Sequence, residues 1–131
     1  MLLNDFDEID RSLAPAAELF NYLSDVKRIE NWHLELEKNY QDIENYLRFY
    51  NSLNSIYHLL RQRLLSKNTA YTGLAQRLIA EDLGLIKSWL KEKDKKRIVF
   101  IGLDALTMSQ ETIIGHLIKE EICDIFWDSD E

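Results

Sequence analysis

Hydrophobic positions along the first two thirds of the chain recur at spacings of three and four residues, which is typical of amphipathic helices. Asn31–His33 and residues 67–69 interrupt the pattern, and residues 34–41 fit either a short helix or a connector. The pattern predicts an antiparallel array of helices joined by short connections. The expected helices cover residues 3–13, Pro15 to about Glu30, Asp42 to about Ser66, and Ala70 or Thr72 to Lys93.

The third of these helices has the most regular apolar stripe. It consists of Tyr46, Tyr50, Leu53, Tyr57, Leu60 and Leu64, and Phe49 and Ile56 widen it. An aromatic stripe can stack the bases of a single-stranded nucleic acid. Because few basic residues precede Arg61 and Arg63, core packing is the favoured interpretation. In the fourth helix Gly84 falls in the middle, and the expected buried face is Leu74, Leu78, Ile79, Leu83, Ile86, Trp89 and Leu90.

The last third of the chain changes character. Ile98–Gly102 is a short apolar run, a helix capped by Thr107 or Ser109 follows, and Cys123–Trp127 is a second apolar run. This order predicts two parallel strands joined by a right-handed helical crossover. The expected fold class is therefore mostly α, with a helical part over residues 1–95 and a small βαβ unit over 96–131.

A βαβ unit normally belongs to a larger parallel sheet that is covered on both faces. Only two strands are expected here, and both of their faces are apolar. The helical array is expected to cover the face that the crossover helix leaves open. The mismatch between two strands and the usual larger sheet suggests a piece of a longer protein.

Composition narrows the function classes. The 131 residues are 46% hydrophobic and 30% charged, which fits one globular domain. The formal net charge of −7 argues against a self-sufficient nucleic-acid-binding protein but leaves room for a basic face. The single cysteine fits a reducing compartment, and no membrane span or secretory signal is evident. A cytoplasmic location is expected.

Basic residues gather at the end of the fourth helix. They are candidates for contacts with DNA, together with Arg61 and Arg63 of the third helix. The alternative is that cations simply suit the C-terminus of a helix, where the dipole is negative. The candidates in the run are Lys91, Lys93, Lys95, Lys96 and Arg97.

Acidic residues provide the candidates for a metal site. Asp104, Asp128 and Asp130 follow the two strands and could together hold Mg²⁺ at the carboxyl edge of the sheet. Because the sequence has no phosphate-binding loop, they are more simply solvated loop acids. The four acids of residues 3–13 are likewise interpreted as a solvated helix face.

Neither the histidines nor the cysteine indicates a catalytic site. His33, His58 and His116 lack the spacing of zinc ligands. Cys123 opens a buried strand without an evident base and is expected to be an inert thiol. No catalytic residue and no cofactor are expected.

Three stretches together resemble the AddB/RecB-like proteins of bacterial DNA repair, which pair a superfamily 1 helicase-like region with a PD-(D/E)XK nuclease. The first is the opening LLNDFDEIDRSL. The second is Tyr71-Thr72-Gly73-Leu74 with Arg77, similar to a Y-x-G-x-x-x-R motif. The third is IVFIGLDALTMSQETIIGHLI, ending in FWDSD.

The resemblance implies an internal piece of a helicase-like region. Residues 1–95 would be a 1B-like helical subdomain, and 96–131 a slice of a RecA-like sheet domain. The Walker B acids of active helicases would fall near Ile101 and Gly102, where this chain has none; the Walker A loop and the nuclease motif are also absent from it. The implied role is a non-catalytic scaffold in DNA end processing and recombination, within a parent exonuclease.

The implied partners are the rest of the parent chain and, through it, DNA, with weak self-association of the isolated piece. Two other interpretations stay open. One is a self-standing helical module that binds another protein. The other is a small metal-dependent or phosphoryl-transfer enzyme that uses Asp104, Asp128 and Asp130.

Overall fold

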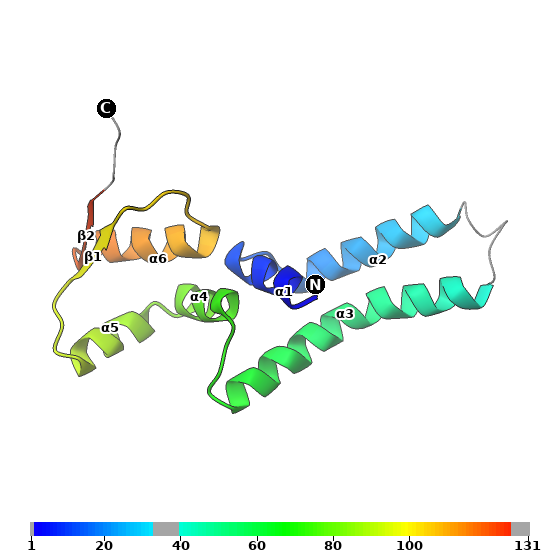
Figure 1. Cartoon of the computed structure of the whole chain (residues 1–131), viewed down its shortest axis with the longest axis horizontal. Coiled ribbons are helices and arrows are strands. Elements are labelled where there is room, and N and C mark those ends of the chain that lie inside the picture. Colours follow the sequence, from blue (N-terminus) through cyan, green and yellow to red (C-terminus); the bar gives the residue numbers. More distant parts are fainter. Residues whose placement is uncertain (1, 33–39, 127–131) are drawn as a thin grey trace. The chain divides into compact units, whose positions relative to one another are not determined.

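The computed structural model describes residues 2–32 and 40–126, with the backbone alone for 27–32, 40–43, 46 and 47. Helices dominate, and a small parallel sheet lies in the last third, so the expected fold class is confirmed (Figure 1). The elements are α1 (Leu2–Arg11), α2 (Ala16–Trp32), α3 (Tyr40–Ser66), α4 (Thr72–Glu81), α5 (Gly84–Glu92), β1 (Ile98–Ile101), α6 (Met108–Lys119) and β2 (Cys123–Phe126). None of the described helices is both long and apolar enough to cross a membrane.

Residues 14–70 form one compact unit, a helical hairpin of α2 and α3. The rings of Phe20 and Tyr57 pack with centroids 5.9 Å apart. One turn further along α2, the hydroxyl of Ser24 donates a hydrogen bond to the side-chain carbonyl of Asn51. The later residue of α2, Ser24, contacts the earlier residue of α3, Asn51, so the two helices are antiparallel.

The stripe on α3 is narrower than the sequence suggests. Leu53 and Tyr57 are buried, but Phe49 and Ile56 are 47% and 37% exposed. The expectation that these two residues widen the buried stripe is therefore wrong. Within this unit α3 packs on a single helix, and such a seam covers only the positions that face the partner. The side chain of Tyr46 lies outside the described part.

Residues 1–13 and 71–131 form the second compact unit, which we call the discontinuous unit. α1 packs on α4 and α6, and α4 also packs on α6. Its buried core is built from Phe6, Ile9, Leu74, Ile114 and Leu117. The compact units thus divide the chain at residues 13 and 70, rather than at residue 95, because α1 and α4 bury their apolar faces with the elements of the βαβ unit.

The expected single helix from residue 70 or 72 to Lys93 is two helices. Asp82 ends α4 with φ −133° and ψ 86°, outside the helical region. Its carboxylate accepts a hydrogen bond from the amide of Gly84 at 3.0 Å, an arrangement by which aspartate turns a chain locally. Gly84 therefore begins α5 and does not lie in the middle of a helix.

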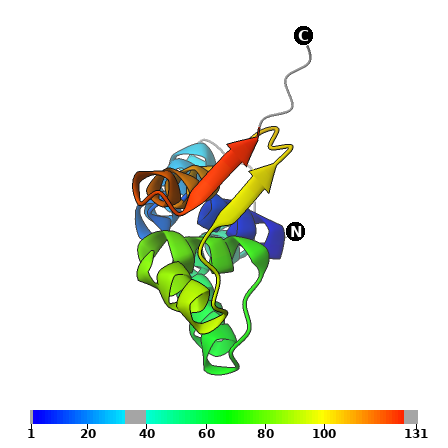
Figure 2. The same ribbon diagram turned by 90° about the vertical axis from the view of Figure 1, so that its left-hand side faces the viewer.

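The expected βαβ unit is confirmed. β1 and β2 are parallel, with Ile98 opposite Cys123 and Ile101 opposite Phe126, and Figure 2 shows the two arrows side by side. Thr107 caps α6 in a capping box: its hydroxyl accepts from the amide of Gln110, whose side chain accepts from the Thr107 amide at 2.9 Å. The buried hydroxyl of Ser109 then links α6 to Gln76 of α4 at 3.2 Å.

One face of the sheet stays open. Val99, Ile101 and Phe126 alternate with the inward residues and are 53%, 74% and 59% exposed. The expectation that the helical array covers this face is wrong for these side chains. An apolar parallel sheet with one bare face is unusual, since parallel sheets are normally covered on both sides.

Candidate functional site

The best-defined polar site of the chain joins α1 to α4 inside the discontinuous unit. We call it the helix clasp; it consists of Asp7, Asp10, Tyr71, Gly73 and Arg77. Asp10 Oδ1 lies 2.7 Å from Arg77 Nε, with the two side chains 0% and 10% exposed. The hydroxyl of Tyr71 donates a hydrogen bond to the other carboxylate oxygen of Asp10.

Because the charged groups of Asp10 and Arg77 are buried, each of them needs a partner. Two opposite charges out of water must be paired and hydrogen-bonded, since a lone buried charge is very costly. Arg77 meets this requirement with a second contact: its Nη2 donates to the backbone carbonyl of Ile9 at 2.9 Å. Its Nη1 lies 3.5 Å from the half-exposed carboxylate of Glu81. The guanidinium thus contacts the last turn of α1 through both the side chain of Asp10 and the backbone of Ile9.

Gly73 lets the two helices approach closely. Its amide donates to Asp7 Oδ1 at 2.6 Å, and a Cβ at this position would lie 2.2 Å from the backbone carbonyl oxygen of Asp7. No side chain larger than hydrogen fits there without a shift of one helix. Asp7 is held in place from its own helix by Arg11, whose Nε lies 2.6 Å from Asp7 Oδ2.

The interpretation of the acids of α1 as a solvated face is wrong for Asp10, which is fully buried. A signal was present in the sequence. Asp7 and Asp10 are three residues apart on one side of α1, and Gly73 and Arg77 are four apart on one side of α4. The clasp thus joins the first and second of the stretches that carry the resemblance.

The carboxyl edge of the sheet provides one described acid. Asp104 is exposed in the loop between β1 and α6, and Asp128 and Asp130 lie outside the described residues. His116 Nε2 lies 3.7 Å from Glu120, His58 packs against the ring of Tyr57, and His33 is outside the described part. Among the residues that the structure describes, no three His, Cys, Asp or Glu side chains are grouped as metal ligands.

Cys123 is buried and free at the start of β2, in agreement with the sequence. Burial is the main cause that raises the pKa of its thiol. The carboxylate of Asp124 raises the pKa further, and the guanidinium of Arg97 opposes both effects. A raised pKa keeps the thiol protonated and unreactive.

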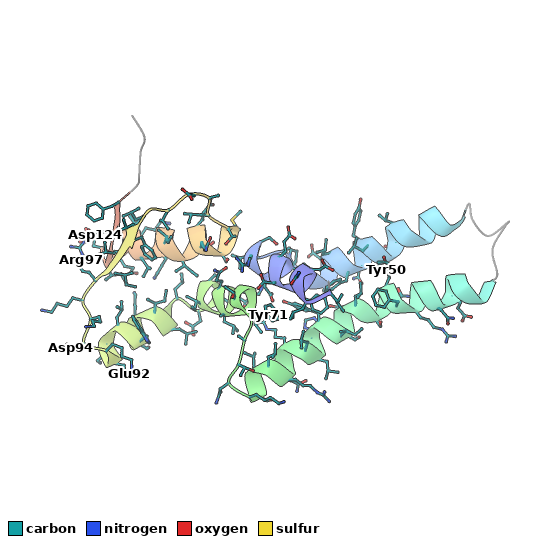
Figure 3. All side chains as sticks on the ribbon, in the orientation of Figure 1. Tyr50, Tyr71, Glu92, Asp94, Arg97 and Asp124 are labelled. Carbon is teal, nitrogen blue, oxygen red and sulfur yellow. The ribbon has the colours of Figure 1, made fainter. Side chains whose placement is uncertain are left out.

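The basic candidates separate into two groups. Arg61 and Arg63 lie on α3 in the hairpin, the former half-buried and the latter exposed. The others lie between the end of α5 and the start of β1. There Lys93 pairs with Glu92 at 3.1 Å. Arg97 Nη2 pairs with Asp124 Oδ1 at 2.6 Å, and Figure 3 shows these two labelled side chains together across β1 and β2.

Lys91, Lys95 and Lys96 line a hollow of about 350 Å³. A fourth lysine, Lys87, which is not among the candidates from the sequence, lines it with them. Lys87 Nζ lies 3.0 Å from Glu120 Oε2, and this contact lowers the pKa of Glu120 by a hydrogen bond and by charge attraction. Leu90 and Ile122 complete the lining. We call this site the lysine hollow; its basic residues are Lys87, Lys91, Lys95 and Lys96.

An apolar groove of about 440 Å³ lies on the other side of α5. Leu85 and Trp89 at its mouth are 48% and 51% exposed. The inward side chains of β1 form its floor together with residues of α4 and α6. The groove is lined by Ile79, Leu85, Ile86, Trp89, Ile98, Phe100, Ile113 and Leu117.

Comparison of the chain with protein-family models, curated proteins and solved structures found no significant match. The clasp, the lysine hollow and the apolar groove are of two kinds. The clasp holds α4 on α1. The hollow and the groove are concave surfaces that a ligand could enter. None of the three combines a nucleophile with a base, which is the arrangement that covalent catalysis needs.

Proposed function

We propose that this chain is a non-catalytic scaffolding part of a longer, cytoplasmic DNA-repair protein of the AddB/RecB-like nuclease type, acting in DNA end processing and recombination. The observation that carries the proposal is the open two-stranded parallel sheet. A pair of strands is marginal on its own in water. This pair has a bare apolar face and a free edge, so it suits a sheet that further strands complete.

The edge of β1 supports this proposal. The amide of Ile98 donates to the carbonyl of Ile122, just before β2, at 2.9 Å, and the amide of Gly102 donates to that of Phe126 at 3.1 Å. In a parallel ladder the alternate residues, Val99 and Ile101, direct their backbone groups to the opposite edge. In the described part of the chain the sheet consists of β1 and β2 alone. Unpaired strand edges are normally covered or blocked in stable proteins.

The end of β1 supports a non-catalytic role. The resemblance places the metal-binding acids of active helicases near Ile101 and Gly102. Ile101 is an apolar side chain, and Gly102 has φ +67°, a conformation that suits glycine. Neither residue can coordinate Mg²⁺ through a side chain. The proposed region therefore positions other parts of the protein rather than hydrolysing ATP.

The helical hairpin fits the proposal as an inserted subdomain. It covers residues 14–70, and the discontinuous unit continues on both sides of it in the sequence. The clasp residues lie just outside the insertion, at Asp10 and Tyr71. In the proposed protein the clasp holds together the two ends of the chain between which the hairpin is inserted.

The test compares one substitution in two lengths of protein. Ile101→Asp should leave the unfolding free energy of the 131-residue chain nearly unchanged, because the side chain is 74% exposed. In the longer parent protein the same substitution should cost at least about 1–3 kcal/mol, since it buries an unpaired charge or polar group. Equal small effects in both would contradict the proposal. Leu59→Asp, at an exposed position of α3, is the control.

Catalysis gives a second readout. The purified 131-residue chain should show neither Mg²⁺-dependent ATP hydrolysis nor DNA cleavage. Either activity, at a level that survives repeated purification and is lost on Asp104→Asn, would instead favour the small metal-dependent enzyme.

A self-standing module that binds another protein is the second candidate, and the apolar groove favours it. Exposed apolar surface rimmed by polar residues commonly marks a protein interaction site. The open reading frame that encodes this chain distinguishes the scaffold from the self-standing module. Continuation past Glu131 into further strands and helices supports the scaffold, and a stop codon there supports the module.

A further inference from the structure

We propose that the lysine hollow binds the sugar-phosphate backbone of a nucleic acid through Lys87, Lys91, Lys95 and Lys96. The proposal deepens the proposed function and rests on it for the choice of nucleic acid among possible polyanions. The location and chemistry of the site come from the charge distribution and geometry of the discontinuous unit.

The charge of this surface is opposite to that of the chain. Residues 87–97 contain six basic side chains and two acidic ones, while the whole protein has a formal net charge of −7. Glu92 is the last residue of α5 and Asp94 lies in the turn that follows, where Figure 3 labels both. The hollow itself is lined by four lysines and one acid, Glu120.

The dipole of α5 explains only part of this cluster. A helix C-terminus attracts cations within its last turn, and the effect falls off beyond it. Lys91 is the only basic residue in the last turn of α5. Lys87 lies earlier in the helix, and Lys95 and Lys96 follow its end at Glu92. The helix dipole therefore does not account for the presence of Lys87, Lys95 and Lys96 at the hollow.

The ammonium groups are available. Within the described residues Lys87 pairs with Glu120, whereas no ion pair is formed by Lys91, Lys95 or Lys96. All four side chains are exposed. Lys87 and Lys91 are four positions apart on α5, a spacing at which like charges repel and destabilise a helix by a few tenths of a kcal/mol. A bound polyanion would remove this repulsion.

The geometry favours a strand of nucleic acid over a membrane surface. The site is concave, so a protruding backbone can enter it, whereas a flat bilayer cannot. A lipid surface binds a helix mainly through apolar residues that enter it. The exposed apolar side chains of α5, Leu85 and Trp89, line the groove rather than the hollow.

The residues that line the hollow also predict how binding depends on the sequence of the nucleic acid and on salt. Apart from lysines and Glu120, the hollow is lined by Leu90 and Ile122, with no aromatic ring on which a base could stack. Phosphate contacts position a nucleic acid without reading its sequence. Binding should therefore be independent of sequence and strongly dependent on salt.

The test measures binding of the 131-residue chain to a fluorescent single-stranded oligonucleotide by anisotropy, between about 50 and 200 mM salt. The triple variant Lys91→Gln, Lys95→Gln, Lys96→Gln removes the three unpaired lysines. It should weaken binding at least tenfold and reduce the slope of log K against log salt by roughly 2, the value for three lost phosphate contacts on a single strand.

The matched control is the triple variant Arg48→Gln, Lys67→Gln, Lys119→Gln, which removes the same charge from exposed positions elsewhere. It should change the affinity less than about twofold. An equal loss in both triple variants would overturn the proposal, because net charge alone would then explain binding. No measurable binding of the unmodified chain at the lowest salt would also overturn it.

Two further arms identify other ligands. Tighter binding to vesicles that contain an anionic lipid, or to poly-glutamate, than to the oligonucleotide would replace nucleic acid by that class. Failure of this test leaves the Ile101→Asp comparison in the two lengths of protein unaffected. Failure of that comparison, with the lysine-dependent binding intact, would overturn the scaffold and keep the site.

Discussion

The amide of Gly73 and the carboxylate of Asp7 lie 2.6 Å apart across 66 positions of the chain. This contact brings the first turn of α4 against α1 so closely that the glycine lies over the Asp7 carbonyl. The neighbouring ion pair of Asp10 and Arg77 closes the same contact from the buried side. The discontinuous unit is therefore joined across the inserted hairpin by a small number of specific contacts, and these are where substitutions should have the largest effects.

Gly73→Ala should destabilise the discontinuous unit. The new Cβ would lie 2.2 Å from the Asp7 carbonyl oxygen, a distance that forces α1 and α4 apart. The expected cost is about 1–3 kcal/mol, typical of overpacking. Hydrogen exchange read separately on peptides from α1, α4 and the hairpin measures this loss and assigns it to one unit.

Gly115→Ala is the matched control. A Cβ at Gly115 meets no atom within 4 Å, and the residue lies inside α6. Alanine should be neutral there or stabilise the helix by up to about 1 kcal/mol. Destabilisation by both substitutions to the same extent would mean that the close approach at Gly73 is not important for stability.

Loss of one partner of the buried ion pair should cost more than a surface substitution. Arg77→Met leaves the carboxylate of Asp10 buried with its Tyr71 hydrogen bond but without the guanidinium. The expected destabilisation is about 3–5 kcal/mol, measured by urea unfolding. Asp5→Asn, at an exposed position of α1, should change stability by less than about 0.5 kcal/mol.

A second substitution tests whether the pair acts as a unit. In the double variant Asp10→Asn, Arg77→Met both charges are gone. Its destabilisation should be smaller than the sum of the two single effects, because neither partner is left as an unpaired buried charge. Strict additivity would show that the two side chains contribute independently.

Much of the fold could be predicted from the sequence because its signals are local. Helical periodicity identified α1, α2 and α3, and the apolar runs identified the two strands. The turn at Asp82 was missed because it depends on one side chain that accepts from the amide of Gly84, while the apolar spacing continues unbroken through it.

The spacing of the clasp residues on α1 and on α4 is visible in the sequence, but their pairing could not be predicted, because the two helices are more than 60 residues apart in the chain. Asp10 has the same local pattern as the exposed acids beside it, and only the approach of α4 makes it buried. Lys87 was likewise missed, because it joins Lys95 and Lys96 through the approach of α5 to the segment between α6 and β2, where Lys87 pairs with Glu120, rather than through the basic run. Long-range proximity is the information that a single sequence does not carry.

The discontinuous unit should fold without the hairpin. Its packing contacts between α1, α4 and α6 are all internal to residues 1–13 and 71–131. The Tyr71–Asp10 hydrogen bond holds the two sides of the insertion together, so a short glycine-serine linker can replace residues 14–70. The shortened protein should give dispersed amide resonances and a cooperative thermal transition. A molten spectrum without such a transition would show that the hairpin is needed.

The thiol of Cys123 should titrate above the usual range of a cysteine. Burial and the carboxylate of Asp124 both raise its pKa, and Arg97 lowers it. Because the folded-state pKa is raised, the contribution of this group to stability is complete below the unfolded-state pKa and is lost as the pH rises through the folded-state pKa. The rate of alkylation by iodoacetamide should therefore rise at a higher pH in the folded chain than in urea.

Two substitutions with opposite effects test the causes of that shift. Asp124→Asn removes a charge that raises the pKa, so the midpoint of the alkylation profile should fall. Arg97→Gln removes a charge that lowers the pKa, so the midpoint should rise. Both substitutions break the same 2.6 Å ion pair between β1 and β2. Mere loosening of the sheet would move both midpoints toward the unfolded value, whereas shifts in opposite directions identify the charges as the cause.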